Sequence, residues 1–259
     1  RVKSSFMQVV DGNRGKRRSG GGRVVAVIPA RYSSKRFPGK ALAPVAGRPM
    51  VVAVWERVRE ARGIDRVIVA TDDDRIRAVV QAAGGEVLMT SPDHPSGTDR
   101  VAETVRGMDN VDIVVNVQGD EPLVQPEMIE ALALALEDDS VAVMATLSTP
   151  LADCDRESHN VVKVVSDASG LALYFSRAPL VGAARHIGLY AYRREFLMKL
   201  AKLPPTALEM AESLEQLRVL EHGYRIRVVP SRFETVAVDT PEDLVKVECI
   251  LGERAEQKA

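Results

Sequence analysis

Apolar and polar positions follow two different periods along the chain from Val24 onward. Short continuous apolar runs alternate with longer segments in which apolar residues recur every three or four positions. Continuous runs rich in β-branched residues are typical of strands buried on both faces, and the longer period is typical of amphipathic helices. The expected strands are 24–28, 65–73, 86–90 and 112–122, and the expected helices are 49–61, 74–84, 97–108 and 126–138. This alternation predicts a parallel sheet with helices on both faces.

The pattern changes after about Ser140. Four segments alternate apolar and polar residues over short lengths, which is typical of antiparallel strands; they are 141–150, 160–167, 171–179 and 186–194. A helix is expected over 207–223 with a stop at Gly223, followed by a strand over 224–231. The last helix is expected to start at Pro241, with Thr240 as N-cap and Asp243 in the capping-box position.

These patterns predict an α/β protein: a Rossmann-like, mostly parallel twisted sheet with helices on both faces, plus a smaller mixed or antiparallel lobe. Residues 1–23 differ from the rest because they are basic, glycine-rich and aperiodic. We expect them to be a flexible lead-in and expect 24–259 to fold as one domain.

Composition excludes several classes of protein. The 259 residues carry a formal net charge of −1, so no global basic field would recruit nucleic acid. No apolar run approaches the roughly 18 residues that span a bilayer, so we expect no membrane segment. Cys154 and Cys249 are far apart and form no CxxC pair, which favours a reducing compartment over a disulfide scaffold or a zinc site. A cytoplasmic location is therefore expected.

The loop over 29–40 directly follows the first expected strand. It contains Arg31, Lys35, Arg36 and Lys40 and ends in Pro-Gly-Lys. Ligands of such sheets bind at the carboxyl ends of the strands, and cations with free backbone N–H groups there form an anion cradle. The loop matches neither GxxxxGK[ST] nor GxGxxG, which argues against a Walker site and against a dehydrogenase. We interpret it as a polyphosphate site, with a solvated basic loop as the alternative.

Acidic residues follow two other apolar runs. Asp120 lies in QGDEP after the most apolar strand, and Asp239 lies in VAVDTPED. Mg²⁺ usually takes one or two carboxylates together with substrate phosphate oxygens, so both are candidate ligands, and Gln118 offers an amide to a ligand. The alternatives are a turn in which Asp120 acts only as a cap, and an Asp239 that only caps the last helix. The spacing does not decide between the two roles of Asp239.

Several polar residues elsewhere indicate further contacts. Ser96, Gly97 and Arg100 occupy the third loop at the strand ends, where His94 is more typical of an ordinary loop residue. In the second half, Arg177 ends a strand. His186 and Tyr190 share one face of another strand, because alternate residues of a strand point the same way. Gln216 lies among leucines and must be hydrogen-bonded if it is buried. Together they suggest a polar pocket with one cation, suited to a polyhydroxy acid, although each also fits a plain role at a rim or in the core.

Seven motifs in order are similar to those of the 3-deoxy-manno-octulosonate cytidylyltransferase family over nearly the whole chain apart from the lead-in. They are IPARYSSKRFPGK, GTDR, VNVQGDEPL, VVKVV with LYFSRAP, RHIGLYAYR, SLEQLRVLE and VDTPEDL. The resemblance implies a fold of nucleotide-diphospho-sugar transferase type and the reaction CTP + Kdo = CMP-Kdo + pyrophosphate, where Kdo is the eight-carbon sugar acid. It also implies Mg²⁺ as cofactor, a homodimer and a place in lipopolysaccharide biosynthesis.

The resemblance implies roles for matching residues. Arg31 and Lys40 would hold the CTP phosphates, Ser96 and Gly97 would contact the nucleotide, and Asp120 and Asp239 would bind Mg²⁺. The sugar acid would be surrounded by Arg100, Gln118, Arg177, His186, Tyr190, Glu215 and Gln216, with Arg177 as the partner of its carboxylate. By the same resemblance, about 24–140 would bind the nucleotide, about 141–238 would bind the sugar and form the dimer, and 239–259 would return to the core as a helix.

The chain departs from the family pattern at two places. The family usually has about twenty more residues between its SRAP and RHIG segments, and ESHNVVK replaces a more usual Asn-Pro-Asn before VVK. Two other functions stay open: a cytidylyltransferase for another 2-keto sugar acid, such as sialic acid or an amino-substituted Kdo, and a non-catalytic protein that binds nucleotide sugars.

Overall fold

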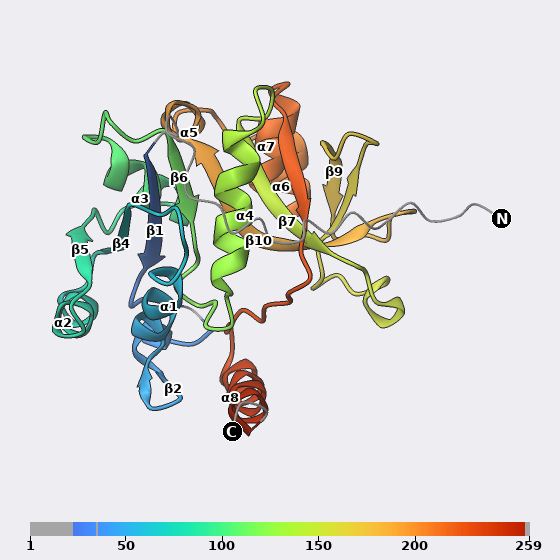
Figure 1. Ribbon diagram of the computed structural model, residues 1–259. Coiled ribbons are helices and arrows are strands. Elements are labelled where there is room, and N and C mark those ends of the chain that lie inside the picture. Colours follow the sequence, from blue (N-terminus) through green and yellow to red (C-terminus); the bar gives the residue numbers. More distant parts are fainter. Residues whose placement is uncertain (1–22, 35, 257–259) are drawn as a thin grey trace.

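The computed structural model describes residues 23–34 and 36–256; the expected lead-in, except Arg23, and Lys35 lie outside the described residues. Within the described residues, nine strands form one sheet (Figure 1). Its main path runs in the order β11-β7-β10-β6-β1-β4-β5, and β8 and β9 pair beside β10. The strands are β1 (Val24–Ala30), β4 (Arg66–Thr71), β5 (Glu86–Met89), β6 (Ile113–Asn116), β7 (Met144–Thr149), β8 (Lys163–Ser166), β9 (Ala172–Ser176), β10 (Ala184–Arg193) and β11 (Ile226–Pro230).

Parallel and antiparallel pairs divide the sheet. β1 pairs parallel with both β4 and β6, and β4 pairs parallel with β5. β10 runs antiparallel between β6 and β7, whereas β11 returns parallel to β7. The predicted fold class is confirmed, and the antiparallel addition extends the main sheet instead of forming a separate one.

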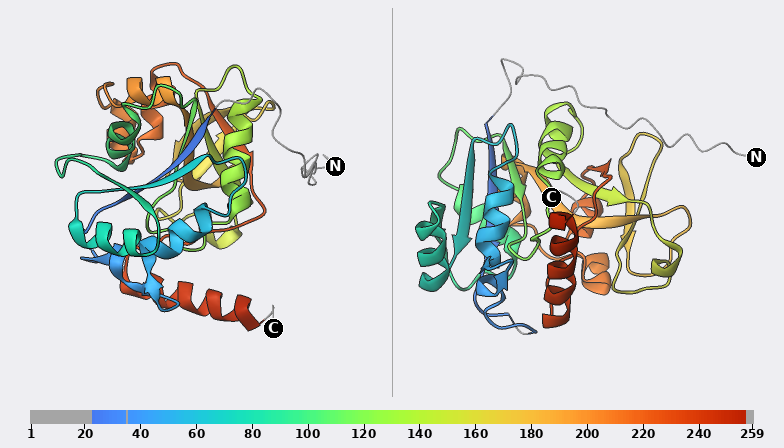
Figure 2. Two further views of the ribbon diagram at one scale, coloured as in Figure 1. Left: turned by 60° about the vertical axis from the view of Figure 1, so that its left-hand side comes forward. Right: turned by 60° about the horizontal axis from the view of Figure 1, so that its bottom comes forward.

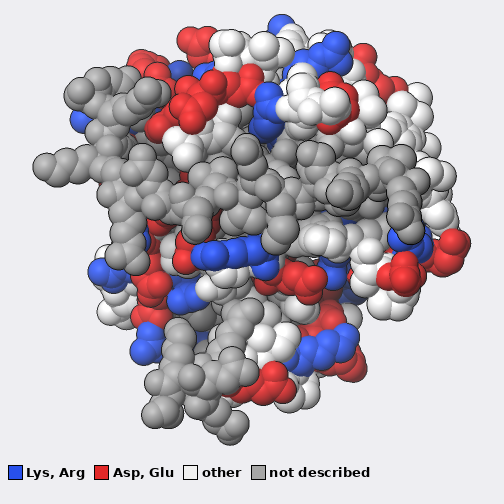
Figure 3. Space-filling view, turned by 45° about the vertical axis from the view of Figure 1, so that its right-hand side comes forward, with Lys and Arg blue, Asp and Glu red and all other residues white. Residues whose placement is uncertain are grey.

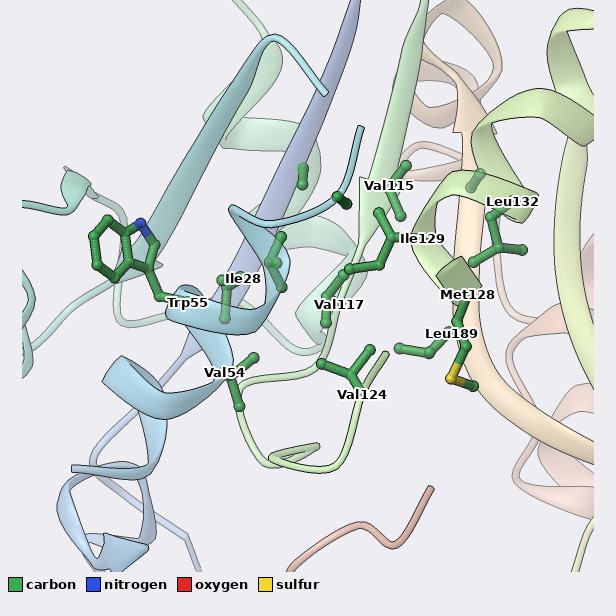
Figure 4. Packing of buried hydrophobic residues seen from close by; sticks show 14 of the residues in the cluster. Ile28, Val54, Trp55, Val115, Val117, Val124, Met128, Ile129, Leu132 and Leu189 are labelled. Carbon is green, nitrogen blue, oxygen red and sulfur yellow. The ribbon is translucent and has the colours of Figure 1, made fainter. Parts of the chain in front are cut away.

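Helices cover both faces of the sheet. They are α1 (Met50–Val58), α2 (Asp74–Ala82), α3 (Gly97–Val105), α4 (Pro126–Glu137), α5 (Arg194–Leu200), α6 (Ala207–Glu212), α7 (Gln216–Glu221) and α8 (Pro241–Glu256). Val24, Ala26 and Ile28 face the core that α1 and α4 cover (Figure 4). Val25 and Val27 face the opposite core, to which α3, α5 and α7 contribute. β1 is therefore apolar at successive positions because both of its faces are buried.

The segment 194–223 differs from the sequence prediction. The single helix expected over 207–223 is wrong, because α6 and α7 are separated at Ser213, whose φ of 54° is left-handed. α6 begins with a capping box between Thr206 and Glu209, and the left-handed residue ends it after less than two turns. Gly223 follows α7 with φ 79°, as expected, and α5 was not predicted at all.

The last helix begins as predicted. The Asp243 carboxylate accepts a hydrogen bond from the Thr240 N–H at 3.1 Å, and the Thr240 hydroxyl accepts one from the Asp243 N–H at 3.3 Å. α8 lies at one edge of the molecule (Figure 2), beside the small hairpin of β2 (Pro44–Val45) and β3 (Arg48–Pro49). Val238 and Val247 pack there against Met50 in a separate apolar cluster. This packing fixes the chain just after Val238, where Asp239 lies.

Surface charge and hydropathy agree with the composition. On the face in Figure 3, Lys and Arg side chains are interspersed with Asp and Glu in the area that is not grey. Among the described residues, no helix has both the length and the apolar character needed to cross a bilayer.

Candidate functional site

A cleft of about 650 Å³ opens at the carboxyl ends of β1 and β6. Residues from the loop after β1, the start of α3, the turn after β6 and the segment before α8 line it. Eight of the predicted site residues line this main cleft: Arg31, Lys40, Ser96, Gly97, Arg100, Gln118, Asp120 and Asp239. The topology brings them together because β1 and β6 are parallel neighbours whose chains leave the sheet at the same edge.

The basic loop after β1 is fixed by its own turn. Gly39 adopts φ 74°, a left-handed conformation that favours glycine, and its N–H donates to the Tyr32 carbonyl at 2.9 Å. The Arg75 guanidinium lies 3.3 Å from the centre of the Tyr32 ring. The short 3₁₀ helix Lys40–Leu42 then begins, and the side chain of its first residue, Lys40, lines the cleft.

The turn after β6 approaches the end of β1 very closely. A Cβ atom on Gly119 would lie 3.0 Å from the Pro29 carbonyl oxygen, so only glycine fits without a shift. The next residue, Asp120, accepts a hydrogen bond through its carbonyl from the Val238 N–H at 2.9 Å. This backbone bond joins the two segments that carry Asp120 and Asp239.

Lys40 connects the two aspartates. Its ammonium donates to the Asp120 carboxylate, to Asp239 Oδ1 at 3.2 Å and to the Val238 carbonyl at 3.1 Å. Burial disfavours the charged form of Lys40, but the two carboxylates outweigh burial and raise its pKa. Two carboxylates that lie 80 and 199 positions from Lys40 in the chain thus meet at one cation.

The same donor set fits a divalent cation. Asp120 and Asp239 offer the hard oxygen ligands that Mg²⁺ prefers, and the position between them already holds a positive group. Among the described residues, no group of three or more His, Cys, Asp or Glu side chains is placed to hold a metal ion. A Mg²⁺ ion here would need further oxygens from a ligand, which suits a triphosphate.

Asp239 is not the cap of α8. Thr240 and Asp243 make the capping box, which leaves the Asp239 carboxylate free to face the cleft. There it also forms an ion pair with Arg36 at 2.9 Å. From the sequence, Arg36 is only one of the cations in the loop, and its contact with Asp239 cannot be read from spacing.

The start of α3 forms another wall. Ser96 is the N-cap, since its hydroxyl accepts from the Asp99 N–H at 3.1 Å, and Gly97 begins the helix. A helix N-terminus favours anions. Arg100, only 4% exposed, donates to the Thr90 hydroxyl and lies 3.4 Å from the Asp72 carboxylate. His94 also lines the cleft, where its ring contacts the Glu103 carboxylate, although its sequence position suggested an ordinary loop residue.

Glu121, the neighbour of Asp120, was not singled out from the sequence. Its side chain is 7% exposed, and its Oε2 has no hydrogen-bond partner among the described residues. Burial, reinforced by the Asp120 charge, raises the pKa of Glu121 to about 8. Its position one residue after a cleft aspartate was visible in the sequence, but its burial depends on β10 and the 234–237 segment.

Three of the remaining predicted residues surround a second, smaller hollow. Tyr190, Glu215 and Gln216 line a space of about 40 Å³ between β10 and α7, which we term the tyrosine hollow. The Tyr190 hydroxyl is 3.5 Å from Gln216 Oε1, and burial raises the pKa values of both Tyr190 and Glu215. The Thr98 hydroxyl donates to Glu215 at 2.8 Å, which connects this hollow with the α3 wall of the main cleft.

His186 lies on the same face of β10 as Tyr190, as predicted, with their ring centres 5.7 Å apart. Its Nε2 is 2.9 Å from the Thr146 hydroxyl, and burial lowers the pKa of His186 to about 3. His186 lines a third hollow of about 120 Å³ together with Glu121 and Arg185. The buried histidine is therefore a neutral group at neutral pH.

Arg177 lies apart from the main cleft. Its Nε donates to the Glu212 carbonyl and its Nη1 to the His159 carbonyl, both at 3.1 Å. The predicted sugar-acid residues are thus divided: Arg100 and Gln118 line the main cleft, whereas Arg177, His186, Tyr190, Glu215 and Gln216 lie outside it.

Comparison with known proteins gives the family. A family model described as Cytidylyltransferase matches residues 25–226. A 3-deoxy-manno-octulosonate cytidylyltransferase of Syntrophotalea carbinolica is 52% identical over 246 residues, which cover 88% of this chain and 98% of the relative. The chain belongs to the 3-deoxy-manno-octulosonate cytidylyltransferase family. It is accordingly a nucleotidyltransferase.

A second relative and a solved structure support this assignment. The Myxococcus xanthus 3-deoxy-manno-octulosonate cytidylyltransferase is 54% identical over 242 residues, covering 90% of this chain and 98% of the relative. A solved structure of CMP:2-keto-3-deoxy-manno-octonic acid synthetase complexed with CTP superimposes with a TM-score of 0.86. That structure is 41% identical and covers 90% of this chain and 100% of its own.

Proposed function

We propose that this enzyme transfers the cytidylyl group of CTP to Kdo and releases pyrophosphate. The proposal rests on the meeting of Asp120 and Asp239 at Lys40, in the cleft that the basic loop after β1 also lines. Carboxylates and cations in one cleft are what a magnesium–triphosphate substrate requires. The membership of the chain in the cytidylyltransferase family supports CTP and Kdo as the pair of substrates.

The residues of the main cleft divide into two groups in this reaction. Arg31, Lys40 and the start of α3 hold the triphosphate, because cations and helix N-termini stabilise phosphate oxygens. Asp120 and Asp239 would hold Mg²⁺. When bound, the ion would offset charge on the phosphate oxygens and steady the pyrophosphate as it leaves.

The chemistry joins two anions, so electrostatics dominates the design of the cleft. Two unit charges 4 Å apart repel each other by about 4 kcal/mol at an effective dielectric constant near 20. Arg31, Arg36 and Lys40 place positive charge on one side of the cleft, and Arg100 adds a buried guanidinium on the other. These cations let the 2-hydroxyl of Kdo approach the α-phosphorus of CTP in line with the leaving pyrophosphate.

The sugar acid is proposed to bind toward the side of β10. Tyr190, Glu215 and Gln216 offer hydroxyl, carboxyl and amide groups there, and Gln216 Nε2 is a buried donor with no partner among the described residues. Unpaired buried polar groups are costly, which suits a site completed by a ligand. His186 contributes a neutral ring, and Arg177 is the proposed partner of the sugar carboxylate.

The wider setting is also proposed. The family suggests an enzyme that works as a homodimer in the cytoplasm and activates Kdo for lipopolysaccharide biosynthesis. The reducing compartment is supported by Cys154 and Cys249, which are both unpaired and exposed.

Release of pyrophosphate from CTP tests the proposal. Purified enzyme should release pyrophosphate when CTP, Kdo and Mg²⁺ are all present, and omission of Kdo or Mg²⁺ should abolish the release. UTP in place of CTP is the matched nucleotide control. Faster release with sialic acid or an amino-substituted Kdo would assign a different sugar acid. Binding of CTP in calorimetry without pyrophosphate release would contradict catalysis.

A further inference from the structure

A buried lysine lies in the part of the sheet beside Arg177. Lys163, at the start of β8, is fully buried, with 0% of its surface exposed. Its ammonium donates to the Ser158 carbonyl at 2.6 Å and to the Arg177 carbonyl at 2.8 Å. Both acceptors are backbone carbonyls. Removing an ammonium from water costs free energy, and these two hydrogen bonds offset part of that cost. An apolar side chain could be buried at this position without the cost.

The two carbonyls belong to different segments. Ser158 lies in the turn before β8, and Arg177 directly follows β9. In the sheet, Lys163 is in register with Ser176 of β9 and with Arg185 of β10. The ammonium of Lys163 therefore connects the turn at Ser158 and the end of β9 to β8, the strand between β9 and β10.

Hydrogen bonds hold both the backbone and the guanidinium of Arg177. Its N–H donates to Glu212 Oε2 at 2.9 Å, while its carbonyl accepts from Lys163. Its guanidinium donates through Nε to the Glu212 carbonyl and through Nη1 to the His159 carbonyl. His159 is the residue after Ser158, so Lys163 fixes both the backbone of Arg177 and the turn that orients its guanidinium. Within the described residues, Nη2 of Arg177 has no hydrogen-bond partner and is the nitrogen left for a ligand.

The connection between β9 and β10 makes this fastening important. It comprises only residues 177–183. Val181 in its middle is 98% exposed, and Gly182 adopts φ 71°. The connection itself therefore buries little surface that could fix the position of Arg177. The hydrogen bonds from Lys163 and with Glu212 fix it instead.

We propose that Lys163 is a positioning residue for sugar-acid binding. It acts through Arg177: its ammonium sets where the guanidinium lies, and the guanidinium takes the carboxylate of the substrate. This inference rests on the proposed function, since it requires Arg177 to bind the sugar acid. It assigns no contact between Lys163 and either substrate.

The test compares Lys163→Met with Lys202→Met, an exposed lysine used as the matched control. Methionine keeps the length of the side chain and removes its charge and donors. In Lys163→Met, we expect KM for Kdo to rise about tenfold or more, the effect of losing hydrogen bonds to a charged donor. The affinity for CTP alone, measured by calorimetry, should stay within about twofold of the wild type. Lys202→Met should change neither value.

A double-mutant cycle separates positioning from simple structural support. Arg177→Met should raise KM for Kdo by itself, and the added Lys163→Met should then have little further effect, because both changes act on one contact. An unchanged KM for Kdo in Lys163→Met, or an equal loss of CTP affinity, would overturn the inference.

A folding defect has its own control. If Lys163→Met does not fold, Lys163→Arg is used instead, because it keeps the charge and changes the donor geometry. The Lys163→Arg variant should still raise KM for Kdo without changing the affinity for CTP. Wild-type activity there would overturn the inference. Absence of pyrophosphate release by the wild type with CTP and Kdo would instead contradict the proposed function.

Discussion

Asp239 and Thr240 are neighbours with different tasks. Spacing alone allowed either of them to cap the last helix, and the structure gives that role to Thr240 with Asp243. The Asp239 carboxylate instead faces Lys40 and Arg36. At the scale of single residues, a shift of one position separates a helix cap from a carboxylate that lines the cleft.

His186 gives a pH dependence to stability. Burial lowers its pKa from 6.5 to about 3, so between these values the unfolded chain binds a proton that the folded chain does not. The contribution of His186 to the free energy of unfolding is therefore fully present above pH 6.5 and is lost as the pH falls toward 3. The wild type should lose up to about 1.4 kcal/mol per pH unit relative to His186→Gln in this window. Urea unfolding of both proteins from pH 7 to 4 measures the difference, and parallel pH profiles would contradict it.

The sequence located some site residues better than others. Arg31, Lys40 and Asp120 could be placed because each follows an apolar run whose carboxyl end forms the ligand edge of the sheet. Glu121 could not, because its raised pKa depends on burial by segments distant in the chain. The Arg36 contact with Asp239 was also hidden, since it joins residues 203 positions apart in one ion pair.

At the scale of elements, the turn after β6 passes very close to the end of β1 at the cleft. Gly119→Ala should move the turn after β6, because the added Cβ would lie 3.0 Å from the Pro29 carbonyl oxygen. We expect a loss of about 1–3 kcal/mol in the free energy of unfolding, together with reduced turnover from the displaced Asp120. Gly107→Ala is the matched control, since its Cβ would meet nothing within 4 Å. Equal behaviour of the two variants in thermal unfolding and pyrophosphate release would refute the close approach.

The break between α6 and α7 gives a second prediction. Ser213 adopts φ 54° and ψ 47°, a conformation that costs less for glycine than for serine. Ser213→Gly should therefore raise the free energy of unfolding by about 1 kcal/mol. Ser140→Gly, at an exposed position without a positive φ, should not stabilise the protein. A lower melting temperature for both variants would show that the left-handed conformation carries no strain.

The two periods of the sequence predicted most elements because strands and helices here are buried on defined faces. β1 was recognisable since all seven of its residues are buried. The break at Ser213 was not, because the leucines around it keep a helical spacing through 214–220. A left-handed serine leaves no mark on the spacing of apolar residues. The capping box at Thr206 marks where α6 begins but not where it ends.

At the scale of the whole molecule, segments far apart in the sequence build the site. The main cleft combines the loop after β1, the turn after β6 and the segment before α8, and the sheet order explains their meeting. The residues predicted to bind the sugar acid do not all lie in one place. Tyr190 and Gln216 line the tyrosine hollow, whereas Arg177 lies outside it and bonds the Glu212 carbonyl. Their shared role in binding the sugar acid stays a prediction, because sequence motifs do not give the distances between residues.

The proposed homodimer is a prediction at this scale. Leu173 on β9 and Met210 on α6 are 59% and 66% exposed, which leaves apolar surface in the second half of the chain. Light scattering during gel filtration should give twice the 28.2 kDa mass of one chain. The mass of a single chain at micromolar and higher concentrations would contradict the dimer.

Asp120 and Asp239 are proposed to form one cation site that serves the CTP phosphates. The most direct measurement is the Mg²⁺ dependence of pyrophosphate release from CTP and Kdo in the wild type, Asp120→Asn and Asp239→Asn. Asp153→Asn is the control, since Asp153 is exposed and its carboxylate contacts only Arg156 among the described residues. Each cleft variant should lose turnover by about 100-fold or more at saturating Mg²⁺ while remaining folded. Near wild-type turnover with unchanged Mg²⁺ dependence in either cleft variant would contradict this assignment of the cation site.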